Sequence, residues 1–169
     1  MAFKKGTMKI LGSVLIVASV FGLTQSTSAQ QAEEKRLTPA EVPWPGGIVA
    51  GGTGTSGAQG IQTIVLQGDP TKPGLYTIRL KIASNLRIQA HLHQDLRSAV
   101  VVSGTWYFGY GHTFDEKALK ELPAGSFYTE PANVDHFAMT KGEVIVQITG
   151  YGPTSTKYFD PELDPSRKK

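Results

Sequence analysis

The 169-residue sequence contains no cysteine and only four histidines. Without cysteine, the chain has no disulfide bond, no thiolate nucleophile and no thiolate metal ligand. No Gly-x-Ser-x-Gly or Ser-His-Asp arrangement is present. The glycine-rich segment 51–57 is not followed by Lys-Ser or Lys-Thr, which excludes a phosphate-binding P-loop. The fold therefore depends on core packing, and its chemistry depends on imidazole, carboxylate and guanidinium groups.

The first 29 residues have the layout of a secretory signal peptide. Three lysines precede the apolar run 10–23, and Thr27-Ser28-Ala29 offers small residues at the cleavage site. The run is shorter than the roughly 20 residues that a membrane span needs. We expect cleavage after Ala29, giving a periplasmic or secreted protein without stable membrane insertion. The alternative is an uncleaved N-terminal anchor.

Removal of this leader also removes the excess of positive charge. The chain has 17 basic and 14 acidic residues, and three of the basic residues but none of the acidic ones lie in the leader. The remaining chain is therefore close to neutral. A polyanionic partner such as nucleic acid is not expected.

The rest of the chain alternates short β-rich segments with Gly, Pro and Asp turns. Such a pattern predicts an all-β sandwich or barrel. Segment 114–125 has a short helical pattern, and a helical turn is expected after Thr38. We expect an irregular N-terminal arm over 30–58, a barrel over 59–152 and a polar tail over 153–169. The expected strands lie within 61–69, 74–83, 86–93, 97–111, 125–131, 136–140 and 142–152.

His91 and His93 lie two residues apart in one expected strand. Side chains alternate between the faces of a strand, so both imidazoles point the same way and can converge on one ion. Imidazole nitrogen is a ligand for zinc, iron, copper and nickel. The pair alone leaves open that these are two histidines on a polar strand face.

The surrounding spacing resembles the cupin superfamily. Its two motifs hold a His-x-His pair, a following acid and Gly, and then Pro-x-Gly with a later His. The resemblance covers about 59–152 and is closest to exported single-domain bacterial cupins of the type-2 conserved-barrel and anti-sigma-factor-like kind. It implies one small jelly-roll barrel that holds a metal on His91, His93 and His136. The matching residues are Gly74, His91, His93, Gly104, Pro123, Gly125 and His136.

Arg97 stands where that family has its glutamate ligand, and arginine cannot ligate a metal. Three outcomes stay open: the metal sits on three histidines alone, Asp95 or Glu130 supplies an oxygen, or the site has lost its metal and is a pocket. Arg97 itself is either an anion clamp for a substrate between it and the metal, or a partner of Asp95 or Glu130 that fixes structure.

The resemblance implies a metal-dependent enzyme, an oxygenase, isomerase or lyase, that acts on a small molecule, which is an anion if Arg97 is a clamp. Its cofactor would be one divalent transition metal: iron, manganese, zinc, nickel or copper. The alternative is a non-catalytic cupin that binds or senses a small ligand, with or without metal. The resemblance also allows a homodimer.

Overall fold

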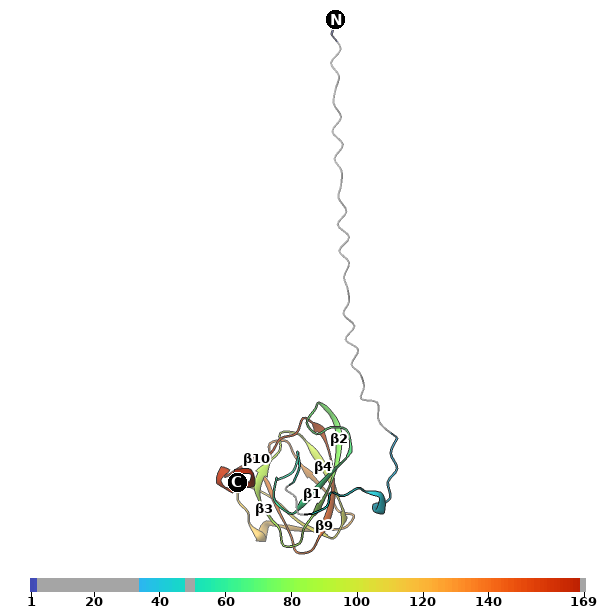
Figure 1. Cartoon of the computed structure of the whole chain (residues 1–169). Coiled ribbons are helices and arrows are strands. Elements are labelled where there is room, and N and C mark those ends of the chain that lie inside the picture. Colours follow the sequence, from blue (N-terminus) through green and yellow to red (C-terminus); the bar gives the residue numbers. More distant parts are fainter. Residues whose placement is uncertain (3–33, 48–50, 168–169) are drawn as a thin grey trace.

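The computed structural model describes residues 1–2, 34–47 and 51–167. The predicted signal peptide, apart from its first two residues, and the start of the predicted arm lie outside them. The described residues from 51 onward form a β-structure whose strands surround a common interior (Figure 1). Within the described part of the chain, no helix has the length and apolar character needed to cross a membrane.

The described residues form strands and single 3-10 turns, without an α-helix. Alternating apolar and polar residues produce strands here because one side of each sheet faces the core. The strands are β1 (Ile61–Gln67), β2 (Gly74–Ile82), β3 (Arg87–Leu92), β4 (Arg97–Ser103), β5 (Thr105–Tyr110), β6 (Lys120–Pro123), β7 (Phe127–Glu130), β8 (His136–Thr140), β9 (Val144–Gly152) and β10 (Lys157–Tyr158).

The strands form two five-stranded antiparallel sheets. One sheet has the order β1-β2-β9-β4-β7, and the other has the order β10-β3-β8-β5-β6. Strands distant in sequence are neighbours in both sheets, as the long crossings of a jelly roll require. The predicted all-β jelly-roll barrel is therefore confirmed.

The inward side chains of both sheets form one core. In β2 and β9 the buried Ile78 lies opposite Ile148, and Leu80 lies opposite Val146. Trp106 and Phe108 of β5 join the same cluster from the other sheet. Each such side chain contributes roughly 1.5–3 kcal/mol when it is fully buried. This packing accounts for a stable barrel without disulfide bonds.

The helical pattern in 114–125 was a wrong prediction. Only one 3-10 turn forms there, at Glu116–Ala118, with Asp115 accepting a hydrogen bond from the Lys117 amide. β6 follows immediately and pairs with β5, which places Leu122 in the core. Pairing with the sheet outweighs the weak local helix preference. The helical turn expected after Thr38 is present as a 3-10 turn, Pro39–Glu41.

The arm and the tail both pack against the barrel. β10 adds to β3 as an edge strand, with Tyr158 opposite His91. Thr55 and Ser56 of the arm are buried, and Ser56 accepts a hydrogen bond from the Tyr158 hydroxyl at 2.7 Å. Two segments outside the expected barrel range therefore meet at the strand that carries the histidine pair.

Candidate metal centre

Three buried histidines come together inside the barrel. His91 lies in β3, His93 follows that strand directly, and His136 begins β8. Antiparallel pairing of β3 with β8 sets His91 opposite His136. One ring nitrogen from each histidine lies within 4.8 Å of the other two. The residues that the sequence predicts as metal ligands thus form one cluster, which could bind a metal ion.

Backbone carbonyls fix the orientation of all three rings. The Nδ1 atoms of His91, His93 and His136 lie 2.8, 2.8 and 3.1 Å from the carbonyl oxygens of Gln89, Ser155 and Val134, respectively. A carbonyl oxygen only accepts, so each Nδ1 carries the hydrogen in these bonds. The lone pair of each neutral ring is then on Nε2, the atom that a metal needs.

Burial keeps two of these rings neutral. Loss of water around His91 holds its pKa well below the usual 6.5, and the neighbouring His136 lowers it further. Burial also lowers the pKa of His136, although the negative charge of Glu130 opposes that effect. A metal ion competes with protons for these nitrogens. The lowered pKa values therefore favour metal binding at neutral and mildly acidic pH.

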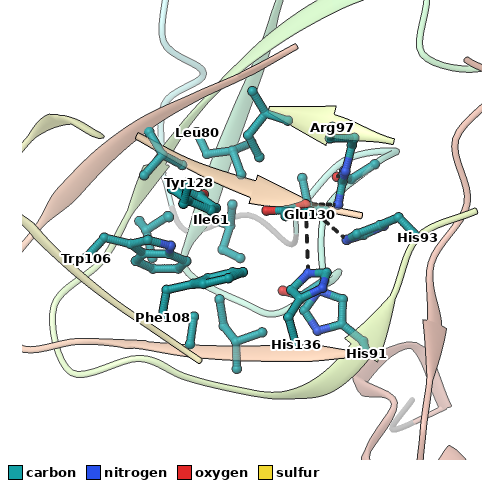
Figure 2. Close-up of a pocket in the computed structure, with 18 residues that line it drawn as sticks. Ile61, Leu80, His91, His93, Arg97, Trp106, Phe108, Tyr128, Glu130 and His136 are labelled. Carbon is teal, nitrogen blue, oxygen red and sulfur yellow. Dashed lines mark hydrogen bonds and ion pairs between the residues drawn. The ribbon is translucent and has the colours of Figure 1, made fainter. Parts of the chain in front are cut away.

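A carboxylate faces the histidines from the other sheet. Glu130 ends β7, and its Oε2 lies 3.9 Å from Nε2 of His93 and 3.8 Å from Nε2 of His136. Ligands about 2.0–2.2 Å from one ion in a tetrahedral site lie roughly 3.3–3.6 Å from each other, slightly less than these separations. Figure 2 shows Glu130 between Arg97 and the histidines. Three imidazoles and one carboxylate oxygen are a donor set suited to a divalent transition metal.

Arg97 pairs with this carboxylate. The strands β4 and β7 set Arg97 opposite Glu130, and the guanidinium Nη2 forms an ion pair with Oε2. The other terminal nitrogen donates to the carbonyl of Gly54 in the arm. Arg97 is only 1% exposed. The structure thus shows the pairing that the sequence left as one of two roles for Arg97.

Asp95 does not face the histidines. Its two carboxylate oxygens accept hydrogen bonds from the hydroxyls of Tyr76 and Thr154, both at 2.6 Å. Burial and the bond to Asp95 contribute to a Tyr76 pKa of about 12. Of the two acids considered from the sequence, only Glu130 is placed to supply an oxygen to the histidine cluster.

The cluster lies at one end of an internal cavity. The cavity volume open to the centres of water molecules is about 30 Å³. His91, His93, His136, Arg97 and Glu130 form the polar end. Apolar and aromatic side chains line the rest: Ile61, Leu80, Ile82, Ile88, Trp106, Phe108, Tyr128, Ala138, Val146 and Ile148. Figure 2 shows Trp106 and Tyr128 away from His93 and Arg97.

Sequence reasoning missed how the arm and tail build this cavity. Gly54, Thr55 and Ser56 line it, and the Thr156 hydroxyl donates to the Thr55 carbonyl at 2.7 Å. The only local signal was the unusual density of Gly, Ser and Thr in 51–57, which also suits an exposed linker. The polar sequence of the tail contains no signal for β10.

Comparison with solved structures supports the fold. An RmlC-like cupin from Shewanella frigidimarina NCIMB 400 superposes with a TM-score of 0.50 at 19% identity, covering 72% of this chain and 93% of that one. The class that fold and site define is therefore a cupin-like jelly roll with a buried three-histidine cluster. Neither a comparison with protein-family models nor a search of curated proteins finds a match.

Two further structures overlap less well. A protein with a cupin-like fold from Ralstonia eutropha JMP134 has a TM-score of 0.46 at 25% identity, covering 57% of each chain. A salicylate 1,2-dioxygenase from Pseudoaminobacter salicylatoxidans has a TM-score of 0.48 at 14% identity, covering 58% of this chain and 30% of that one. This chain thus spans 57% and 30% of their lengths, and we draw no conclusion about activity from either overlap.

Proposed function

We propose that this cupin-like protein is a metal-dependent enzyme acting on a small anionic molecule. One divalent transition metal would be held by His91, His93 and His136, with Glu130 as an additional oxygen ligand. The observation that carries the proposal is the common orientation of the three rings. Each Nδ1–H is committed to a backbone carbonyl, which leaves three Nε2 lone pairs for one ion.

The charges at the site favour an anionic ligand. Glu130 and Arg97 form a pair of opposite charges, and the lowered pKa values of His91 and His136 favour their neutral forms. A divalent metal would add two positive charges to this nearly balanced group. In a buried cavity such an excess strongly attracts an anion. A carboxylate or enolate is the simplest ligand of that kind.

A bound metal supplies Lewis acidity there, or dioxygen chemistry if it is iron. The protein's part is to position groups around the substrate. The histidine rings are fixed by backbone bonds, apolar and aromatic side chains line the rest of the cavity, and the Glu130 carboxylate offers one more oxygen ligand. Oxygenase, isomerase and lyase reactions all stay within the proposal, because a fold does not select the reaction.

The test is the metal content of the full chain, purified without an added histidine tag. We expect close to one metal per chain by elemental analysis, lost in His91→Ala and in His136→Ala. His112→Ala is the matched control, because His112 is 68% exposed and lies outside the cavity. A parent protein that stays metal-free after incubation with iron, manganese, zinc, nickel and copper would refute the proposal.

The Arg97–Glu130 pair also favours a second candidate, a metal-free binding or sensing protein. Without a metal, the buried carboxylate already has a positive partner. Such a protein would be stabilised by its ligand without forming a product. The enzyme would show turnover that disappears in His136→Ala while the fold is kept.

Export to the periplasm or the medium belongs to the proposal and rests on residues 1–29 of the sequence alone. N-terminal sequencing of the protein from a cell that exports it would test the export, with Gln30 expected as the first residue.

A homodimer is proposed on the resemblance alone, and sedimentation equilibrium would test the oligomeric state. Nucleic acid is not proposed as a partner.

A further inference from the structure

The end of the cavity away from His93 and Arg97 contains two buried polar groups without a hydrogen-bond partner among the described residues. They are Nε1 of Trp106 and the hydroxyl of Tyr128. Their residues are 5% and 6% exposed, and both line the cavity. Trp106 comes from β5 and Tyr128 from β7, so the two sheets bring them together. Figure 2 shows both on the side of the view opposite His93 and Arg97.

Both groups are available as donors. An indole N–H can only donate. A tyrosine hydroxyl carries its own hydrogen and can donate it, and the Tyr128 hydroxyl donates to no atom of the described residues. The indole N–H of Trp106 and the hydroxyl of Tyr128 are neighbours, yet neither atom has a hydrogen-bond partner among the described residues. An unpartnered buried donor is costly, so a ligand oxygen that accepts from it is bound more tightly.

We propose that Trp106 and Tyr128 form a recognition site for a neutral oxygen acceptor at the far end of the anionic ligand. The ligand class is then a small carboxylate with a hydroxyl or carbonyl oxygen separated from it by a short apolar segment. This inference rests on the proposed function, because the metal and Arg97 define the end that receives the carboxylate.

The walls between the two ends support this class of ligand. Phe108 stacks on His136 with ring centroids 5.3 Å apart, and it contacts Tyr128 with centroids 4.6 Å apart. Its ring therefore spans the distance from the metal end to the donor end. Ile61, Leu80 and Val146 line the same cavity. A ligand with polar groups in its middle would lose hydration there without gaining a partner.

Calorimetric titration of the zinc-loaded full chain with matched acids tests the inference. One pair is 3-hydroxypropanoate and propanoate, and a longer pair is 4-oxopentanoate and pentanoate. Each pair differs in the distal oxygen. We expect at least one oxygen-bearing acid to bind about tenfold more tightly than its parent acid. Trp106→Phe and Tyr128→Phe should each reduce that ratio, and the double variant should bring it close to one.

Two controls separate recognition from general damage. Trp44→Phe and Tyr110→Phe remove the same groups outside the cavity and should leave the ratio unchanged. Tyr128→Phe should not lower the melting temperature, because it removes a hydroxyl that has no partner.

The metal content of the same samples shows whether a negative result refutes the proposed metal site or only the proposed recognition site. A parent that holds no metal refutes the proposed metal site. A metal-loaded parent refutes this inference alone if it binds none of the four acids, fails to discriminate within either pair, or keeps its discrimination in the double variant.

Discussion

Arg97 and Glu130 lie opposite each other on the paired strands β4 and β7, and they form an ion pair inside the barrel. The arginine stands at the motif position where a cupin has a glutamate ligand. The carboxylate comes instead from the neighbouring strand and faces the same histidines. The two residues thus supply both a potential oxygen ligand and the charge that balances it.

Breaking this pair should strongly destabilise the metal-free protein. Arg97→Met leaves the Glu130 carboxylate buried and uncompensated, and we expect a loss of about 3–5 kcal/mol in the free energy of unfolding. Urea unfolding measures it, with Arg79→Met, which loses a bond to Gln147, as the control.

Zinc should restore part of the lost stability, because a bound cation compensates the same carboxylate. The double variant Arg97→Met with Glu130→Leu should be more stable than Arg97→Met alone when metal-free. Equal stability of the single variant and the parent would show that the pair is not the charge balance we describe.

Stability of the metal-free protein should fall as the pH drops below about 6.5. His91 and His136 have lowered pKa values in the folded chain, so the unfolded chain binds more protons in that range. Each histidine contributes up to about 1.4 kcal/mol per pH unit below its unfolded pKa. Urea unfolding at about pH 7.5 and about pH 5.5 measures the change.

Other groups titrate in the same range, so a variant isolates the histidine contribution. His91→Gln should show a smaller loss of stability between the two pH values than the parent does. A loss as large as that of the parent would mean that His91 titrates normally in the folded chain.

The contact between Tyr158 and Ser56 should hold the arm over the cavity. Tyr158→Phe removes a buried hydrogen bond but keeps the ring that stacks on His91 at 5.3 Å. We expect a loss of about 1 kcal/mol and faster amide exchange at 54–57. Tyr110→Phe, which removes an exposed hydroxyl that donates to the Thr129 carbonyl, should not change that exchange. Unchanged exchange in Tyr158→Phe would mean that other contacts hold the arm.

Gly104 should not tolerate a side chain. Its φ is +75°, and an added Cβ would come 2.4 Å from the carbonyl oxygen of Glu143. We expect Gly104→Ala to cost at least about 1–3 kcal/mol in unfolding free energy, from backbone strain and this clash. Gly142→Ala is the control, since no atom lies within 4 Å of its added Cβ. Similar melting temperatures for the two variants would contradict the prediction.

The sequence predicted the elements whose signals are local. The short β-rich segments located the strands of the described chain except β6 and β10, and Gly104 marked the break between β4 and β5, because such patterns depend on residues close together in the chain. The resemblance to cupins, carried by the spacing of these histidines and the surrounding Gly and Pro residues, implied that His91, His93 and His136 form one cluster, and the structure contains it.

The helical prediction for 114–125 failed because a contact between residues distant in the chain decides the structure there. Leu119 and Leu122 have a spacing that suits a helix, but Leu122 enters the core from β6 because that strand pairs with β5. Strand pairing depends on the partner strand as well as on the local sequence, so the pattern within 114–125 does not predict it.

By itself, the sequence determined an all-β barrel, three candidate ligands and the replacement of a usual acid by Arg97. Only the tertiary structure decided that Glu130, rather than Asp95, faces the histidines, because strand register sets which side chains are opposite. It also decided that Gly54 and Tyr158 close the site, since segments outside the barrel pattern dock through backbone carbonyls and hydroxyls. Those contacts depend on position in space, and the residue types alone do not encode them.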